Sequence, residues 1–194
     1  MTQRSLDQLL EDIRQCQVCA QSLDCGARPV IQASREAKLL IIGQAPGLKV
    51  HQTGIPWNDQ SGERLRSWLQ MDKRRFYDPK QVAIVPMGLC YPGKGRSGDL
   101  PPRKECAPLW HQEVLARLPN VKLTLLIGQY AQNYYLDEKP KTLTDTVKQF
   151  ARWQHQALFP LPHPSPRNQI WLKKNAWFDD LVLPELQKKI NKIK

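Results

Sequence analysis

Four of the five cysteines stand at spacings that could hold a metal ion or a metal cluster. Cys16 and Cys19 form a C-x2-C pair, and Cys90 and Cys106 enclose fifteen residues further along the chain. A C-x2-C pair supplies two thiolates from one turn, and a metal centre would fix both ends of the polar, Pro- and Gly-rich segment inside the second pair. The spacing leaves zinc, a [4Fe–4S] cluster and plain buried thiols as alternatives, with Cys25 as a free thiol.

One zinc chemistry does not fit this pattern. Zinc nucleobase deaminases place H-x-E before P-C-x-x-C. Here His111-Gln112-Glu113 follows the C-x2-C pair, and Gln15 precedes Cys16. Because both the order and the flanking residue are wrong, we expect His111 and Glu113 on the solvent side of a helix.

Short apolar runs alternate with amphipathic segments along the chain. The pattern predicts strands at 38–43, 81–87, 121–127 and 156–161, and helices at 5–15, 61–70, 104–118, 130–136, 143–153 and 168–193. Alternating strands and helices form a parallel sheet with helices on both faces. We therefore expect a three-layer α/β/α fold with a central four-stranded, mainly parallel sheet. The 194 residues suit a single domain, residues 1–194, and Pro184 is expected to break the last helix.

Ligands of such sheets bind beyond the carboxyl ends of the strands. The segments at those ends are GQAPG (43–47), MGLCYPG (87–93), GQYAQ (128–132) and HPSPRN (163–168). The GQAPG turn could direct backbone N–H groups at a carbonyl or a phosphate, although a plain strand–helix turn would have the same sequence. HPSPRN is either a rigid loop suited to entering a groove or a turn that caps the next helix.

The charge balance indicates a polyanionic partner. Lys and Arg number 29 against 18 Asp and Glu, which gives a net charge of +11 and a pI of about 9.6. Nucleic acid is the first candidate, with acidic proteins and anionic membranes as alternatives. Because no apolar run approaches the ~18 residues of a membrane span and no signal peptide is recognisable, we expect a cytoplasmic protein that does not contact a membrane.

The motifs GQAPG and HPSPRN, taken together with the four cysteines, resemble the uracil-DNA glycosylase superfamily over roughly residues 16–175. The cysteine spacing is similar to that of its bacterial and archaeal iron–sulfur classes (families 4 and 5). HPSPRN resembles the second motif of the single-strand-selective class. The resemblance implies a uracil-DNA glycosylase-like fold. It also implies a [4Fe–4S] cluster held by Cys16, Cys19, Cys90 and Cys106, with structural zinc as the alternative.

The activity that the resemblance implies is that of a monofunctional DNA glycosylase in base excision repair. Such an enzyme flips a deaminated base out of DNA and hydrolyses its N-glycosidic bond, which leaves an abasic site. The transition state resembles a sugar cation and a base anion, so the site needs hydrogen-bond donors, an aromatic platform and a group that orients water. The implied base-binding residues are Gln44, Ala45, Pro46, Gly47, Trp57 and Met87.

The catalytic residues that the resemblance implies are His163, at the oxygen of the base, and a carboxylate that orients water. Gln44 and Ala45 stand where relatives carry a carboxylate. Asp59, in the sequence DQSG (59–62), matches the D-x-S-G element of the broad-specificity class and is the candidate general base. The alternative is that Asp59 only caps the helix that follows. Asn58 is the substitute candidate, because an amide can position water, and His51 is a further one.

The implied substrate is DNA that contains deaminated bases. Stricter relatives end the second strand with an Asn that reads the uracil amide edge, and here this residue is Pro86. We therefore expect relaxed specificity that includes hypoxanthine or xanthine, in a protein that acts as a monomer. The implied DNA-binding residues are Lys94, Arg96, Ser165, Pro166, Arg167 and Asn168.

Two other functions remain open at this point. One is a catalytically degenerate DNA-binding module that retains the base pocket. The other is a phosphate-binding hydrolase on a generic α/β fold, for which the sequence shows no nucleophile or metal triad.

Overall fold

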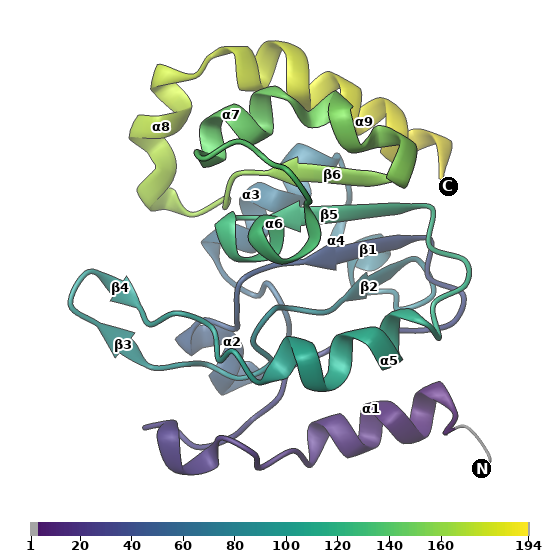
Figure 1. Cartoon of the computed structure of the whole chain (residues 1–194), viewed down its shortest axis with the longest axis vertical. Coiled ribbons are helices and arrows are strands. Elements are labelled where there is room, and N and C mark those ends of the chain that lie inside the picture. Colours follow the sequence, from purple (N-terminus) through teal and green to yellow (C-terminus); the bar gives the residue numbers. More distant parts are fainter. Residues whose placement is uncertain (1–3, 194) are drawn as a thin grey trace.

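The fold is built on a four-stranded parallel sheet with the strand order β2-β1-β5-β6 (Figure 1). A computed structural model describes residues 4–193. The parallel pairs are β1 with β2, β1 with β5, and β5 with β6. The strands are β1 (Leu39–Ile42), β2 (Val82–Ile84), β5 (Leu123–Ile127) and β6 (Leu158–Leu161). The predicted fold class is confirmed, and all four carboxyl ends lie at one edge of the sheet.

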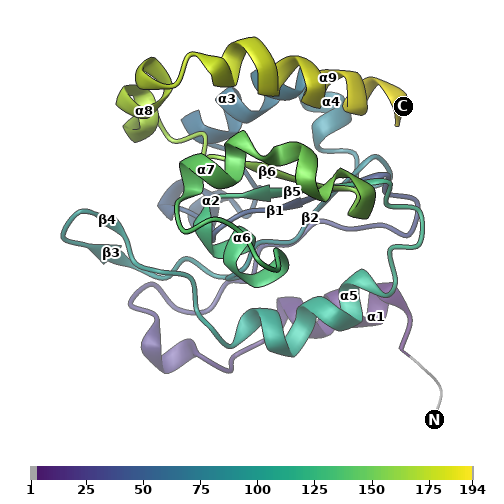
Figure 2. The ribbon, with the colours of Figure 1, turned by 45° about the horizontal axis from the view of Figure 1, so that its top comes forward.

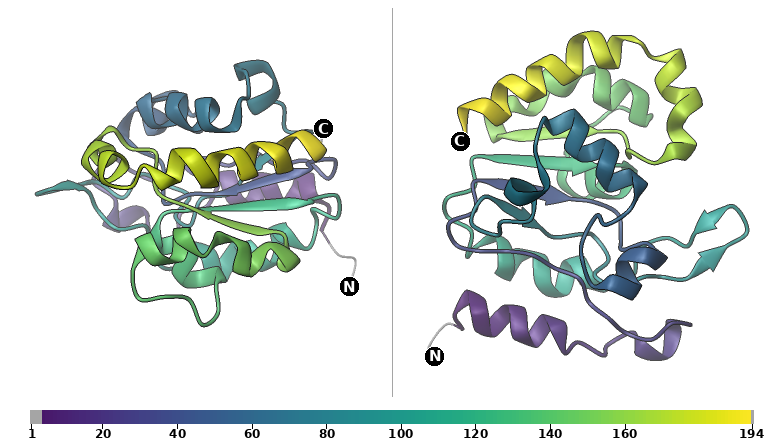
Figure 3. Two further views of the ribbon diagram at one scale, coloured as in Figure 1. Left: turned by 90° about the horizontal axis from the view of Figure 1, so that it is seen from above. Right: turned by 180° about the vertical axis from the view of Figure 1, so that it is seen from behind.

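Helices cover both faces of the sheet, as Figure 3 shows from above and from behind. Neighbouring strand residues enter opposite cores: Leu40 and Ile42 pack with α1, α5 and α6, whereas Leu39 and Ile41 pack with α3, α4 and α9. This two-residue alternation explains why the run is apolar throughout. The helices are α1 (Leu6–Arg14), α2 (Leu48–Thr53), α3 (Gln60–Leu69), α4 (Lys73–Phe76), α5 (Gln112–Leu115), α6 (Gln129–Tyr135), α7 (Leu143–Lys148), α8 (Gln169–Lys174) and α9 (Leu183–Lys192).

Polar N-caps set where the predicted helices begin. Ser5 and Gln8 form a capping box at the start of α1, in which each side chain accepts a hydrogen bond from the other residue's backbone N–H. The Thr142 side chain accepts from the N–H of Asp145 at the start of α7. The short helical turns η1 (Ala20–Ser22) and η3 (Phe150–Gln156) follow α1 and α7.

The two longest predicted helices are interrupted. Segment 104–118 contains a π-helical turn, η2 (Ala107–His111), before α5. Leu109, which lies in this π-helical turn, is exposed. Segment 168–193 breaks at Asn175 and not at Pro184, which directly follows a π-helical turn and lies in the first turn of α9. Its pieces are η4 (Pro166–Asn168), α8, η5 (Phe178–Val182) and α9.

His111 is buried, with 1% of its surface exposed, so its predicted place on the solvent side is wrong. Its Nε2 lies 3.0 Å from the carbonyl oxygen of Pro86, and its Nδ1 lies 2.6 Å from the hydroxyl oxygen of Tyr135. Since a carbonyl only accepts, Nε2–H donates to Pro86 and Nδ1 accepts from Tyr135. Burial lowers the pKa of His111, and the contact with Pro86 offsets part of that effect.

The stability of the protein is expected to fall as the pH drops below 6.5, the ordinary pKa of histidine. The unfolded chain takes up a proton there, whereas folded His111 does so only at lower pH, so its contribution is complete above 6.5 and lost on acidification. The free energy of unfolding changes by at most about 1.4 kcal/mol per pH unit for this one group. In urea unfolding at several pH values, His111→Gln should flatten the dependence. The same substitution at the exposed His155 should not, and equal slopes in both variants would contradict the expectation.

A short antiparallel hairpin extends from the segment between Cys90 and Cys106, where the sequence pattern predicts no strand. Its strands are β3 (Lys94–Gly95) and β4 (Gly98–Asp99), joined by Arg96 and Ser97. Figures 1 and 2 show the hairpin projecting from the edge where the sheet strands end. In the part of the chain that the structure describes, no helix is long and apolar enough to cross a membrane.

Candidate active site

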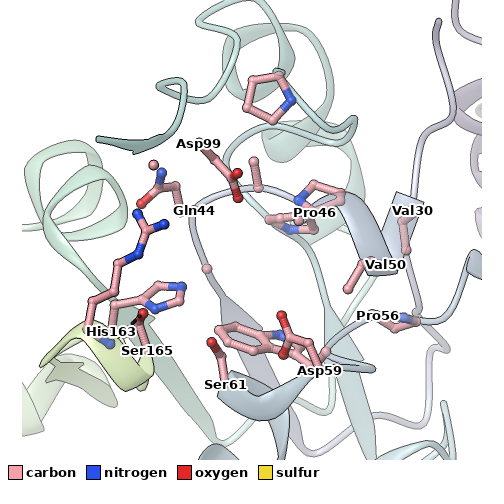
Figure 4. A pocket seen from close by; sticks show the side chains of 18 of the residues that line it. Val30, Gln44, Pro46, Val50, Pro56, Asp59, Ser61, Asp99, His163 and Ser165 are labelled. Carbon is pink, nitrogen blue, oxygen red and sulfur yellow. Dashed lines mark hydrogen bonds between the residues drawn. The ribbon is translucent and has the colours of Figure 1, made fainter. Parts of the chain in front are cut away.

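A cavity of about 450 Å³ lies beyond the carboxyl ends of the strands. Most of its lining comes from four parts of the chain: the GQAPG turn after β1, the residues at the start of α3, the β3–β4 hairpin and the HPSPRN loop after β6. Figure 4 shows Gln44, His163 and Ser165 on one side of it, and Asp59 and Ser61 below. The segments meet because parallel strands end at the same edge.

Trp57 forms one wall of this cavity from a constrained backbone. Its φ is +55°, in the left-handed region that bulky residues rarely adopt. Two glycines make room for it. A Cβ on Gly43 would lie 2.8 Å from the indole, and a Cβ on Gly62 would overlap the Trp57 carbonyl oxygen. The indole therefore lies against the backbone at the end of β1.

Two side chains hold the Trp57 carbonyl in this position. Arg66 Nη1 and the Tyr77 hydroxyl each donate to this oxygen at 3.3 Å. Arg66 is buried and also donates to Tyr77 at 3.1 Å. Because a left-handed non-glycine residue costs about 1–3 kcal/mol, these contacts are needed to maintain it, and strain of this kind is common at functional sites.

His163 is held beside Trp57 by its own loop. The two ring centroids are 5.6 Å apart, and Asn168 Nδ2 donates to the His163 carbonyl oxygen at 2.7 Å. Burial lowers the pKa of His163, and the nearby Asp59 carboxylate raises it only in part. The imidazole is therefore neutral at pH 7, which is the form that can donate one hydrogen bond without bringing a charge.

Asp59 has a capping role and a place in the cavity at the same time. Its Oδ1 accepts from the N–H of Gly62 at 2.8 Å, which caps α3. Its Oδ2 lies 3.9 Å from the point where a Cβ on Gly47 would stand, and Asp59 lines the cavity. The two functions considered for Asp59 are therefore compatible, because each uses a different oxygen.

The GQAPG turn presents backbone donors to the cavity. Its carbonyl groups face the other way: Gly43 accepts from the N–H of Met87, and Gln44 accepts from the N–H of Gly88, each at 2.9 Å. Among the described residues, the N–H groups of Gln44 and Ala45 donate to no protein acceptor. Such paired backbone N–H groups can bind a carbonyl oxygen or an anion.

Hydrogen bonds tie the HPSPRN loop to two neighbouring elements. Arg64 of α3 donates to the Ser165 carbonyl oxygen at 3.0 Å. Arg167 Nη1 donates to the Ser97 carbonyl oxygen at 2.7 Å, which joins this loop to the hairpin. In this structure Arg167 therefore bridges two loops at the edge of the cavity.

The structure brings most of the predicted site residues together. Those that line the cavity are Gln44, Ala45, Pro46, Gly47, Trp57, Asp59, His163, Ser165, Arg167 and Asn168. Met87 packs in the core with α1, and Pro86 lines the cavity in its place. Asn58 donates to Thr53 Oγ1 at 3.5 Å. Lys94, Arg96 and Pro166 are exposed around the cavity, on the hairpin and on the HPSPRN loop.

Sequence reasoning missed the hairpin residues that line the cavity, Ser97, Gly98 and Asp99. A signal for them was present. Gly95 and Gly98 enclose the polar residues Arg96 and Ser97, and glycines around a short polar stretch favour a turn, although this pair is not a common two-residue hairpin loop. Gly98 has a φ of +149°, and the Arg167 guanidinium occupies the space that a side chain there would need.

The four candidate metal ligands form a second group, and none of the five cysteines in the described part of the chain forms a disulfide. Cys19, Cys90 and Cys106 are buried, and Cys16 is partly buried. Burial raises the pKa of Cys90 to about 12 and that of Cys106 to about 11. Hydrogen bonding with the backbone of Arg28 lowers the pKa of Cys90 in part, and hydrogen bonding with the backbone of Leu89 does the same for Cys106. The neighbouring thiols raise both pKa values further.

These thiols are neighbours, but they do not form a ready-made site for one ion. Among residues 4–193, no group of three or more His, Cys, Asp or Glu side chains is placed to hold a metal ion. A zinc ion holds four thiolate sulfurs about 2.3 Å from one centre. In an iron–sulfur cluster the cysteine sulfurs bind different iron atoms, so they lie further apart. The Arg103 side chain contacts Cys19, and its buried Nε has no partner among the described residues. The residues present are therefore buried or partly buried thiols, with an arginine side chain in contact with one of them.

The comparison with protein families agrees with the cavity and its motifs. The family model for the uracil DNA glycosylase superfamily matches residues 31–187, which is most of the chain. The chain therefore belongs to the uracil DNA glycosylase superfamily, whose members act on DNA. The match begins after Cys16 and Cys19, so it says nothing about the first pair of candidate ligands.

Proposed function

We propose that the protein is a monofunctional DNA glycosylase that removes deaminated bases from DNA. The observation that carries the proposal is the cavity itself. It combines an aromatic wall, a neutral histidine, outward backbone N–H groups and a carboxylate oxygen at the strand ends of a superfamily member. These are the groups that hydrolysis of an N-glycosidic bond requires.

Each group has a definite part in the proposed reaction. The flipped base stacks on Trp57 and accepts hydrogen bonds at its oxygens from the N–H groups of Gln44 and Ala45. His163, as a neutral donor, stabilises the negative charge that the base acquires as the bond breaks. Asp59 Oδ2 orients the attacking water and takes its proton. The excess of positive charge in the chain supports binding to the phosphates, with an affinity that falls as salt is added.

The proposed substrates are uracil and deaminated purines. Pro86 lines the cavity at the end of β2, and its carbonyl is occupied by His111. It offers no side-chain amide to read the edge of a base. A pocket without such a reader discriminates weakly between bases that share a lactam edge.

A panel of oligonucleotides tests the proposal and its specificity. Each carries one uracil, hypoxanthine or xanthine and is treated with alkali after incubation, which breaks the strand only at an abasic site. We expect strand breakage with uracil and with at least one deaminated purine. Cleavage at uracil alone would contradict the relaxed specificity. A gel shift without cleavage on any oligonucleotide would favour the degenerate DNA-binding module, which is motivated by Gln44 and Ala45 standing in place of carboxylates.

We also propose that Cys16, Cys19, Cys90 and Cys106 hold a [4Fe–4S] cluster, with structural zinc as the alternative. When bound, such a group would link the segment after α1 to both ends of the segment that carries the hairpin. The residues themselves supply buried thiols and an arginine in contact with one of them.

Replacing Cys90 by alanine is expected to remove the cluster and to lower the melting temperature. The protein purified without oxygen should contain iron and acid-labile sulfide in equal amounts, and Cys90→Ala should contain neither in stoichiometric quantity. Cys25→Ala is the matched control, because Cys25 is exposed and should leave the metal content unchanged. A colourless protein with one zinc per chain would refute the iron–sulfur assignment.

A further inference from the structure

The hairpin brings a second carboxylate to the cavity. Asp99, the last residue of β4, lines the cavity together with Asp59, and Figure 4 shows the two side chains reaching it from opposite sides. The Oδ2 atoms of Asp99 and Asp59 lie 3.7 and 3.9 Å from the point where a Cβ on Gly47 would stand. Both oxygens are therefore within 4 Å of one point, and less than 8 Å separates them.

Several contacts fix Asp99 in this place. The Tyr91 hydroxyl, on a buried side chain, donates to Asp99 Oδ1 at 3.5 Å and leaves Oδ2 facing Gly47. The preceding turn is held by the hydrogen bond from Arg167 to the Ser97 carbonyl oxygen. A two-stranded hairpin is only marginally stable by itself. These contacts therefore give the Asp99 carboxylate a defined position at the cavity.

The position of Asp99 opposes the binding of DNA. The chain has a net charge of +11, and a polyanion that approaches the cavity meets two carboxylates at its opening. Repulsion from the phosphates weakens association. A group that opposes binding can still accelerate the reaction when it interacts more favourably with the transition state than with the bound substrate.

The charge that develops during hydrolysis provides that difference. Trp57 and the buried Ile84 line the cavity, and Asp99 lines it from an exposed position. A base stacked on Trp57, as proposed above, would direct its deoxyribose toward the exposed Asp99. The deoxyribose becomes positively charged as the glycosidic bond breaks. A fixed negative charge beside it lowers the energy of that state.

We propose that Asp99 is a second catalytic carboxylate, which stabilises the sugar cation; the inference rests on the proposed glycosylase function. The bond between C1′ and the base nitrogen breaks, and its electron pair leaves with the base. The water oxygen bonds to C1′ and gives one proton to Asp59, and the base anion takes a proton from solvent. Asp99 neither donates nor accepts a proton in this step.

The test compares the chemical step with DNA binding in Asp99→Asn. We expect the single-turnover rate of uracil release to fall about 10- to 100-fold. The Kd for an oligonucleotide with a tetrahydrofuran abasic-site analogue should fall or stay equal, because repulsion is removed. Asp99→Glu should recover part of the rate. A purely structural role would instead weaken binding together with the rate and lower the melting temperature.

Asp24→Asn is the matched control for this substitution. Asp24 Oδ2 lies 3.5 Å from the position of a Cβ on Gly93, near the base of the hairpin, and Asp24 does not line the cavity. Its variant should keep the wild-type rate. If the wild-type protein releases uracil and Asp99→Asn does so within twofold of that rate, the inference about Asp99 fails alone. If the wild-type protein releases no base from any oligonucleotide, the proposed function fails, and the inference fails with it.

Discussion

Replacing Asp59 by asparagine is expected to lower the rate of uracil release by about 10²- to 10⁴-fold while the protein stays folded. Asparagine caps helices as well as aspartate does, so the hydrogen bond from Gly62 to the side chain should remain. The substitution removes the negative charge of the carboxylate and replaces Oδ2, the oxygen near Gly47, by an NH2 group that cannot accept a proton. Single-turnover release from a uracil oligonucleotide measures the rate, and a gel shift with an abasic-site analogue should show binding at least as tight.

Asp72→Asn provides a matched comparison. Asp72 caps α4 by accepting from the N–H of Arg75 at 2.7 Å, and it does not line the cavity. It should leave both the rate and the melting temperature close to those of the wild type. If Asp59→Asn behaves like Asp72→Asn, Asp59 serves only as a cap, and another group must orient the water.

Replacing Gly62 by alanine is expected to destabilise the protein and to remove the stacking wall. Inside a helix this substitution ordinarily stabilises by about 1 kcal/mol. Here the new Cβ would overlap the carbonyl oxygen of Trp57, so the Trp57 backbone must move away from Arg66 and Tyr77. We expect the free energy of unfolding in urea to fall by about 1–3 kcal/mol, and the release of uracil to slow at least tenfold.

Ser67→Ala is the matched control, because it raises helix propensity in the same helix without bringing an atom against the Trp57 carbonyl oxygen. Ser67 is exposed in the same helix, so alanine there should stabilise the protein slightly through its higher helix propensity. Opposite signs for the two substitutions would confirm that the Trp57 carbonyl sets the cost at Gly62. A stabilising Gly62→Ala would show that Trp57 is free to move and is not held as the structure describes.

The sheet and most of its helices could be predicted because the pattern that specifies them is local. The run 38–43 is apolar on both faces because Leu40 and Leu39 enter different cores. Ser5 and Thr142 mark helix starts through hydrogen bonds to residues three positions further on. The motifs GQAPG and HPSPRN meet at one cavity because the topology places the strand ends at one edge.

The missed features depend on contacts between residues that are distant in the chain. His111 is buried because Pro86 and Tyr135 satisfy its two ring nitrogens, and neither partner is visible in the sequence around position 111. Asp99 reaches the cavity because the hairpin is held by Arg167, about seventy residues further along the chain. The left-handed backbone of Trp57 needs Arg66 and Tyr77, whose spacing shows no periodic pattern.

The hydrogen bond from Arg167 to the Ser97 carbonyl links two equilibria. A phosphate or a base edge that binds the Arg167 guanidinium must replace the Ser97 carbonyl as its hydrogen-bond partner. Binding of a ligand to Arg167 and release of the hairpin are therefore one coupled process. Any affinity gained through Arg167 then includes the cost of the lost contact, about 0.5–1.5 kcal/mol. By reciprocity, a change that loosens the hairpin would make Arg167 more available to nucleic acid, at the expense of the fixed position of Asp99.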